Sequence, residues 1–198
     1  MRRKRVAILI SGRGSNMSAL IEASKAPDYP AEIVGVLSNR AAAPGLATAA
    51  AKGIATASLA QSRFPSREMF EDVLTLMLES WETDIVCLAG FMRILGEDFV
   101  QRWSGRMINI HPSLLPLYKG LDTHKRALAD GAQVHGCTVH FVSPGLDEGA
   151  PILRAEVPVL PGDTPDTLAA RVLVQEHRIY PEALRLLAEG HLPQPSIH

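Results

Sequence analysis

The apolar positions along the chain fall into two kinds of stretch that alternate from the N-terminus onward. Short continuous apolar runs such as 6–10 are typical of strands buried on both faces of a sheet, whereas apolar residues three or four positions apart, such as Met17, Leu20 and Ile21, are typical of helices. The pattern predicts strands at residues 5–10, 31–38, 54–57, 84–89 and 107–111. It predicts helices at residues 15–24, 42–52, 66–79, 96–103 and 122–130.

The C-terminal third departs from this strict alternation. Residues 134–142 and 151–159 both have the character of strands, and the short segment SPGLDEG between them allows an antiparallel hairpin. Alternating apolar and polar residues in 134–142 predict that one face of that strand is wetter than the other. A long last helix begins after Thr164, where Pro165 and Asp166 complete a typical helix start.

These elements predict an α/β fold with an open, mostly parallel, twisted sheet of the Rossmann type, helices on both faces and an antiparallel hairpin near the C-terminal part. No repeat, low-complexity segment or linker divides the chain. We therefore expect a single domain over residues 1–190, followed by a loose tail over 191–198.

Composition narrows the possible partners and the compartment. A chain of 198 residues with 46% hydrophobic residues, a formal charge of -1 and a pI near 6.7 has no overall charge that would attract nucleic acid or an anionic membrane. The basic opening MRRKR precedes only five apolar residues, too few for a signal peptide, so we read it as the flank of the first strand. Cys87 and Cys137 lie in apolar runs, which favours buried reduced thiols and a cytoplasmic protein.

A polar pair leaves the strand at 107–111. Asn109 and His111 are two residues apart, so on an extended chain both side chains point to the same face. Pro112 and Pro116 then stop the strand, and ligands of open α/β sheets bind beyond such strand ends. A carboxamide and an imidazole placed there could act on one substrate atom. A turn cap and an ordinary loop histidine explain the pair equally well.

The turn after the first strand, SGRGSN at 11–16, suits an anion. Its glycines allow close approach of the backbone, and the helix start presents free N–H groups. The turn lacks the third glycine of a dinucleotide fingerprint and the G-K-[ST] end of a P-loop. We therefore expect a single phosphate on Gly14, Ser15 and Asn16, the alternative being a glycine-rich turn without a ligand.

Two carboxylates and one histidine are further candidates. Asp147 either forms a turn or supplies a carboxylate opposite His111. Glu176 falls in the apolar stripe of the last helix, so it needs a partner or a ligand. His140 is a core residue or a site residue. The remaining candidates His124, His135 and His177 have the character of solvated helix or loop residues, and no cluster has metal-ligand spacing, so we expect no metal.

Five stretches resemble the phosphoribosylglycinamide formyltransferases, a branch of the folate-dependent formyltransferase family. They are residues 6–17, 89–95, 109–120, 139–153 and 175–181. N-x-H-P-S-L-L-P with a downstream L-D-x-G is specific for the wider family, and S-G-x-G-S-N favours the glycinamide branch. A length of 198 residues leaves no room for the extra domains of methionyl-tRNA formyltransferases or formyltetrahydrofolate deformylases, so we expect the glycinamide branch.

The resemblance implies a role for each matching residue. Asn109, His111 and Asp147 match the catalytic trio. Substrate contacts are implied for Gly14, Ser15 and Asn16 at the phosphate, Glu176 at the ribose, and Pro112. Folate contacts are implied for Arg67, Met92, Arg93, Ile94, Leu95, Asn109, Ser143, Pro144, Gly145, Leu146 and Asp147. Residues up to about 104 would form the phosphate-binding half, and residues from about 105 to 190 the catalytic and folate half.

The activity implied is formyl transfer from 10-formyltetrahydrofolate, as co-substrate, to the amine of 5-phosphoribosylglycinamide in purine biosynthesis. Asn109 and a protonated His111 would stabilise the tetrahedral intermediate, while Asp147 would favour the charged imidazole and relay protons. The partners expected are these two small molecules, with the chain a monomer or a homodimer. A formyltetrahydrofolate hydrolase and a non-catalytic nucleotide-binding module are the alternatives.

Overall fold

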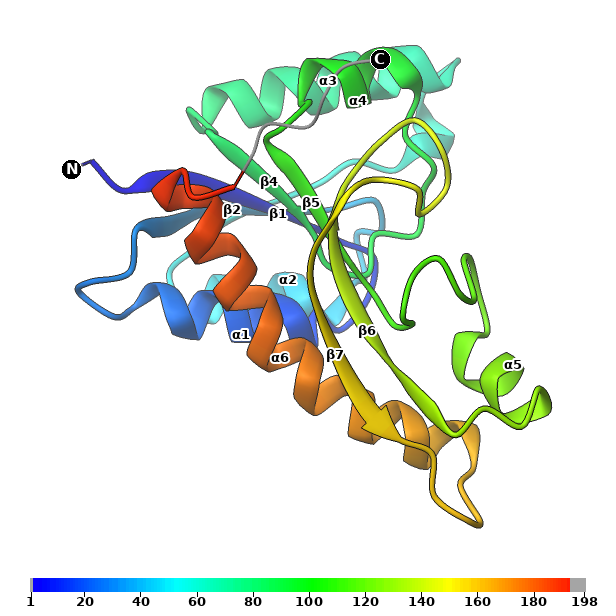
Figure 1. The fold of residues 1–198 in the computed structure, drawn as a ribbon. Helices are drawn as coiled ribbons and strands as arrows, with labels where there is room; N and C mark the ends of the chain where they lie inside the picture. The colour runs from blue at the N-terminus through cyan, green and yellow to red at the C-terminus, as the bar shows by residue number, and fades with distance from the viewer. Residues whose placement is uncertain (1, 193–198) are drawn as a thin grey trace.

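The computed structural model describes residues 2–192, whose strands form a single seven-stranded sheet (Figure 1). The strands are β1 (Lys4–Ile10), β2 (Ala31–Ser38), β3 (Ala55–Ser58), β4 (Ile85–Leu88), β5 (Met107–His111), β6 (Val134–Phe141) and β7 (Pro151–Pro158), in the spatial order β3-β2-β1-β4-β5-β6-β7. Strands β1 to β5 are parallel, and β6 is antiparallel to both β5 and β7. The predicted fold class is confirmed. The part of the expected tail from 193 to 198 lies outside the described residues.

Helices cover both faces of the sheet. They are α1 (Ser15–Ser24), α2 (Pro44–Ala51), the short 3-10 helix η1 (Gln61–Arg63), α3 (Arg67–Ser80), α4 (Glu97–Arg102), α5 (Thr123–Ala129) and α6 (Pro165–Glu189). Figure 1 shows α3 and α4 on one face, and α1, α2 and α6 on the other, with α5 apart from both layers. Within residues 2–192, no helix has the length and apolar character needed to cross a membrane.

The start of α2 differs slightly from the prediction of residue 42. Pro44 takes the first helical position, where its fixed φ suits a helix and its missing N–H costs nothing. The residue before a proline is pushed out of the helical region, and Ala43 accordingly has an extended conformation with φ -62° and ψ 121°. Proline therefore delays the helix.

The sheet separates two apolar cores. In β1, Val6, Ile8 and Ile10 pack in the core shared with α1 and α6, while Ala7 and Leu9 pack in the core shared with α3 and α4. Successive residues of a strand point to opposite faces, so a strand covered on both sides must be apolar throughout. This is the physical reason that β1 is a continuous apolar run.

Strand β6 contradicts the prediction of one wetter face. Thr138 and His140, the polar residues of that face, are 0% and 3% exposed. Neighbouring loops cover them: Thr138 Oγ1 donates to the main-chain oxygen of Ser113 at 2.8 Å, and Asp147 Oδ1 lies 3.9 Å from His140 Nε2. The alternation therefore marks a face that is polar but enclosed.

Tyr180 of α6 ties the long helix to two central strands, β4 and β5. Its ring is fully buried, and its hydroxyl lies 2.8 Å from the main-chain oxygen of Leu88 and 3.1 Å from that of Ile108. Leu88 ends β4, and Ile108 directly precedes Asn109. The one hydrogen of the phenol is shared between these two carbonyl oxygens, which anchors α6 against the strands next to the candidate site.

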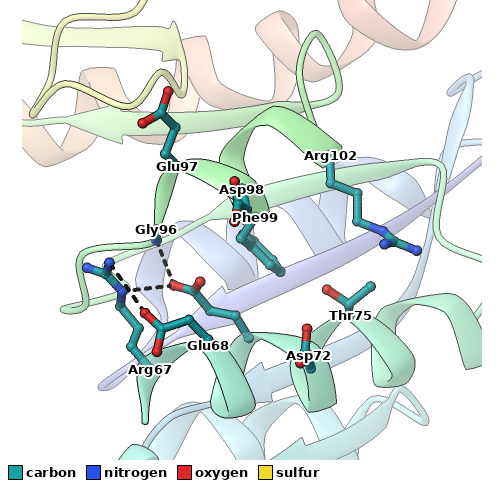
Figure 2. Close-up of a pocket in the computed structure, with 10 residues that line it drawn as sticks. Arg67, Glu68, Asp72, Thr75, Gly96, Glu97, Asp98, Phe99 and Arg102 are labelled. Atoms are coloured by element: carbon teal, nitrogen blue, oxygen red, sulfur yellow. Dashed lines mark hydrogen bonds and ion pairs between the residues drawn. The ribbon is translucent and has the colours of Figure 1, made fainter.

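Helices α3 and α4 form a cavity of about 340 Å³ on the face of the sheet opposite α1 and α6 (Figure 2). Its lining is strongly acidic and includes Glu68, Asp72, Glu97 and Asp98. Arg67, the first residue of α3, lies on its wall next to Gly96, the residue that precedes α4.

Candidate active site

Strand β5 brings two polar side chains to the carboxyl edge of the sheet. Its residues alternate between faces, so Asn109 and His111 share the face of Met107, beyond the apolar core to which Met107 belongs. Antiparallel pairing with β6 places His140 opposite Asn109, and Thr138 opposite His111. One face of this two-stranded ladder therefore carries an amide, two imidazoles and a hydroxyl.

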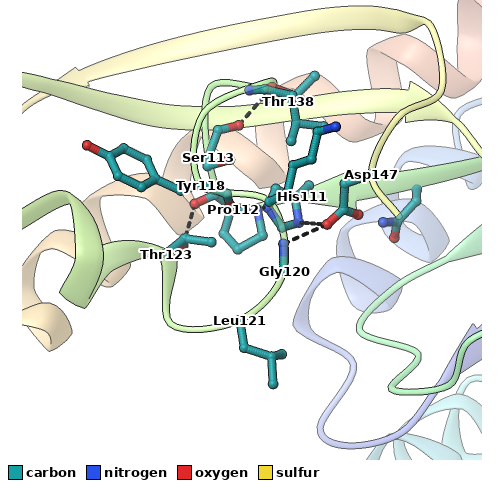
Figure 3. A network of polar contacts seen from close by, with 12 residues as sticks. His111, Pro112, Ser113, Tyr118, Gly120, Leu121, Thr123, Thr138 and Asp147 are labelled. Carbon is teal, nitrogen blue, oxygen red and sulfur yellow. Dashed lines mark hydrogen bonds and ion pairs between the residues drawn. The ribbon is translucent and has the colours of Figure 1, made fainter. Parts of the chain in front are cut away.

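The His111 ring is buried, and each of its nitrogens faces an acceptor. Nε2 lies 2.9 Å from the main-chain oxygen of Tyr118, which can only accept, so Nε2 carries a hydrogen. Nδ1 lies 3.4 Å from Oδ2 of Asp147, as Figure 3 shows. The ring is thus held between the Tyr118 carbonyl at Nε2 and the Asp147 carboxylate at Nδ1.

Asp147 reaches His111 from a different loop, between β6 and β7. Its Oδ2 accepts a hydrogen bond of 2.9 Å from the main-chain N–H of Gly120 (Figure 3). Both residues have left-handed backbones, with φ of 52° for Asp147 and 79° for Gly120. Glycine adopts this conformation freely, and aspartate more readily than most residues. The bond fixes the carboxylate against the loop that follows β5.

That loop is itself held by side-chain hydrogen bonds at both ends. Pro112, expected at the substrate, has its main-chain oxygen bonded to Thr123 Oγ1 at 2.7 Å, and the main-chain oxygen of Ser113 accepts from Thr138 (Figure 3). The Tyr118 carbonyl that accepts from His111 belongs to the same loop.

His140 orients the Asn109 amide. Nδ1 of His140 donates to the main-chain oxygen of Phe141 at 2.8 Å, so Nε2 of the neutral ring is an acceptor. Nε2 lies 3.3 Å from Nδ2 of Asn109 and accepts one of its two hydrogens. Burial lowers the pKa of His140, which keeps the ring neutral. The second N–H of Asn109 remains available to a ligand.

A cavity of about 270 Å³ adjoins Asn109 and collects most of the residues expected at the folate. Its lining includes Arg93, Ile94, Leu95, Asn109, Ser143, Pro144, Gly145, Leu146 and Asp147. The apolar side of the lining is completed by Leu88, Phe91, Val100 and Val142. Segments that follow β4 and β6, far apart in sequence, thus form one enclosure that includes Asn109 and Asp147.

Two of the residues expected at the folate are not in this lining. Met92 is 58% exposed, while its main-chain N–H donates to Ser11 Oγ at 2.8 Å. Arg67 lines the cavity between α3 and α4 instead. Ser11 begins the glycine-rich turn, so its bond to Met92 joins the turn directly to the segment after β4.

The glycine-rich turn has the geometry of an anion site. Gly14 precedes α1 with φ 70°, a conformation that favours glycine, and Ser15 and Asn16 form the first turn of the helix. The first N–H groups of a helix have no partner within the helix and carry the positive end of its dipole. Ser15 is exposed, so this end of α1 is open to a ligand.

Asn16 and Glu176 meet beneath this turn. Asn16 is buried, and its Oδ1 has no hydrogen-bond partner within the described residues. Burial raises the pKa of Glu176 to about 7, partly offset by the Asn16 side chain beside it. Because this value exceeds the ordinary 4.5, the folded protein binds the Glu176 proton more tightly than the unfolded chain does. The free energy of unfolding therefore decreases as the pH rises from about 4.5 to about 7. Both groups can accept hydrogen bonds from a hydroxylated ligand.

The prediction that His135 is solvated is wrong, whereas His124 on α5 is partly exposed. His135 is 1% exposed, and its Nε2 lies 3.1 Å from Nδ1 of His124. Burial, with a smaller contribution from His124, lowers the pKa of His135 to about 4. This pair has no third ligand: nowhere within residues 2–192 do three His, Cys, Asp or Glu side chains converge as a metal ion requires.

Several groups that hold the site escape sequence reasoning. The Tyr118 and Phe141 carbonyls and the Gly120 N–H belong to the main chain, so no side-chain motif identifies them. Thr138 and His140 do leave a signal, because polar residues alternating with Cys137 and Val139 mark a face next to Asn109.

Comparison with known proteins agrees with this geometry. The formyl transferase family profile matches residues 4–184. The phosphoribosylglycinamide formyltransferase of Escherichia coli K12 is 48% identical over 187 residues, which cover 94% of this chain and 88% of that protein. The human trifunctional purine biosynthetic protein adenosine-3 is 50% identical over 96% of this chain, but the chain spans only 19% of that protein's length.

Solved structures show the same relation. The crystal structure of phosphoribosylglycinamide formyltransferase from Brucella melitensis has a TM-score of 0.92 and 53% sequence identity, and the match covers 98% of this chain and 100% of that one. The chain is therefore a member of the formyl transferase family, in the branch of the phosphoribosylglycinamide formyltransferases.

Proposed function

We propose that this protein transfers the formyl group of 10-formyltetrahydrofolate to the amine of 5-phosphoribosylglycinamide, a step of purine biosynthesis. The observation that carries the proposal is the convergence of Asn109, His111 and Asp147 beside the cavity of about 270 Å³. Both substrates are small molecules. The chain acts as a monomer or a homodimer in the cytoplasm, and no metal takes part.

The reaction forms one C–N bond and breaks another. The neutral amine attacks the formyl carbon, negative charge develops on the former carbonyl oxygen, and the bond from carbon to the folate N10 then breaks as one proton moves from the amine to N10. Asn109 donates its free N–H to the developing oxyanion. Nε2 of His111 already bonds to the Tyr118 carbonyl. The hydrogen that His111 offers to the oxyanion is therefore the one on Nδ1.

Asp147 has two roles in this scheme. Its carboxylate lies 3.4 Å from Nδ1 and orients the imidazole ring. It also accepts the proton that the amine loses, directly or through a water, and returns it toward the leaving N10. No serine or cysteine side chain acts as a nucleophile, and no covalent enzyme intermediate forms.

The amine substrate is held at the start of α1. Its phosphate accepts from the N–H groups at Gly14, Ser15 and Asn16, and its ribose hydroxyls donate to Glu176, whose buried carboxyl is close to Asn16. Pro112 lines this side. The folate lies in the cavity between the segments after β4 and β6. Arg67 and Met92, which lie outside that lining, contact the part of the folate that extends beyond it.

The deciding experiment follows the absorbance of the folate product with 10-formyltetrahydrofolate, in the presence and in the absence of 5-phosphoribosylglycinamide. We expect product only when both are present. Release of folate without the amine would identify a hydrolase, and no release in either case would leave a binding module as the function.

The phosphate site is tested with Ser15→Asp. An acid in the first turn of a helix stabilises the helix by about 0.3–1 kcal/mol, so the fold should be preserved. The same charge repels a phosphate, and we expect the KM for the amine substrate to rise at least about tenfold while that for folate stays unchanged. Ser15→Ala, which removes only the hydroxyl, is the control and should give a smaller rise. An equal rise for both substrates would place the phosphate elsewhere.

The oxyanion role is tested with Asn109→Ala. Loss of one oxyanion donor lowers kcat by about 10²–10³-fold, and binding should change little because the contact strengthens only in the transition state. Steady-state kinetics with each substrate varied will measure the split. A variant with normal kcat would remove Asn109 from the mechanism.

The role of Asp147 is tested with Asp147→Asn. Asparagine has the same shape, adopts left-handed backbone readily and can still accept from the Gly120 N–H, so the loop should remain in place. Loss of the proton acceptor should lower kcat by about 10²–10⁴-fold with little change in the KM for folate. If the KM for folate rises instead and kcat is retained, Asp147 acts only by holding the loop.

A further inference from the structure

Glu71 on α3 is a buried carboxylate that the proposed mechanism does not use. Only 7% of the residue is exposed, whereas the other acids of the cavity between α3 and α4 face solvent. Carboxylates are rarely buried unless they are bonded to a donor. The contacts of Glu71 therefore indicate what it does.

Glu71 binds the main chain immediately before α4. Its Oε1 accepts a hydrogen bond of 2.6 Å from the N–H of Gly96. The same oxygen lies 3.8 Å from Nε of Arg67, one helical turn earlier. A Cβ at position 96 would come within 2.8 Å of Glu71 Oε2 and 3.3 Å of Arg67 Nε, so glycine leaves room for this close approach.

Gly96 ends the irregular segment that carries Arg93, Ile94 and Leu95 to the cavity beside Asn109. A segment outside helix and strand has few hydrogen bonds of its own to fix it. Side chains from elsewhere secure both of its ends: Ser11 bonds the N–H of Met92 at 2.8 Å, and Glu71 bonds the N–H of Gly96. The position of one cavity wall thus depends on these two tethers.

We propose that Glu71 is a positioning residue for the folate substrate, which it serves by fixing the segment 92–95 and the Arg67 guanidinium through one carboxylate. The proposal rests on the proposed function, because it assigns the adjoining cavity to folate. A hydrogen bond to a carboxylate is roughly twice as strong as one between neutral groups, so the bond to the Gly96 N–H contributes most to fixing the segment. The Arg67 side chain is 47% exposed, so its ion pair with Glu71 contributes less.

The test compares Glu71→Ala, Glu71→Gln and Glu68→Ala in the full chain. Glu71→Ala removes both contacts, and we expect the KM for 10-formyltetrahydrofolate to rise about tenfold, with kcat at saturation and the KM for the amine substrate within about twofold. Glu71→Gln retains an acceptor for Gly96 and should restore most of the affinity. Thermal unfolding will establish that each variant is folded.

Glu68→Ala is the matched control. Glu68 lies on the same helix, 3.9 Å from Nη2 of Arg67, but does not contact Gly96. Its KM for folate should stay within about twofold of the unsubstituted protein. An equal rise for Glu68→Ala and Glu71→Ala would overturn the proposal, because it would assign the effect to charge near Arg67. Equal rises in KM for both substrates would overturn it as well.

A second measurement does not depend on turnover. Amide hydrogen exchange across residues 91–96 should accelerate in Glu71→Ala and remain unchanged in Glu68→Ala. Unchanged exchange would exclude the tether even if the protein proves inactive. Failure of the unsubstituted chain to transfer formyl, with faster exchange in Glu71→Ala, would instead reject the proposed function and retain the tether.

Discussion

The antiparallel pairing of β5 with β6 is the constraint on which the candidate site depends. Strand β5 has a parallel neighbour, β4, on one side and an antiparallel neighbour, β6, on the other. Because β6 runs in the opposite direction, His111 at the end of β5 faces Thr138 in the middle of β6. In this way the Asn109 amide gains His140 as its acceptor, and the Thr138 hydroxyl comes within hydrogen-bond distance of Ser113 in the loop after β5. Had β6 run parallel, a crossover of many residues would have been needed, and the short loops that deliver Asp147 and Tyr118 would have had no common edge.

Much of the fold was accessible from the sequence because each strand and helix carries a local signal. The apolar run of β1 reflects burial on both faces, and the capping of α6 by Thr164 and Pro165 is a property of adjacent residues. Enclosure by distant loops carries no local signal. The polar face of β6 was therefore predicted to be wetter, and His135 was predicted to be solvated, although both are buried.

The candidate site was likewise predictable only where a local sequence pattern marks the residue. Asn109 and His111 follow from their spacing in one strand, and Glu176 from its place in an apolar helical stripe. The bond between Gly120 and Asp147 joins two loops through left-handed residues, and the contact of Glu71 with Gly96 joins a helix to a segment 25 positions away. Such contacts depend on how the chain returns upon itself, which composition and periodicity do not encode.

Strand β7 has a consequence for the behaviour of many copies in solution. It forms an outer edge of the sheet, and an open edge is a template on which the strand of another molecule can add. Pro151 and Pro158 remove an N–H donor at either end of β7, while Arg154 and Glu156 place charge on its exposed positions. The opposite edge, β3, has only four residues. Both margins are thus poor nuclei for aggregation, which protects a sheet whose central strands are apolar throughout.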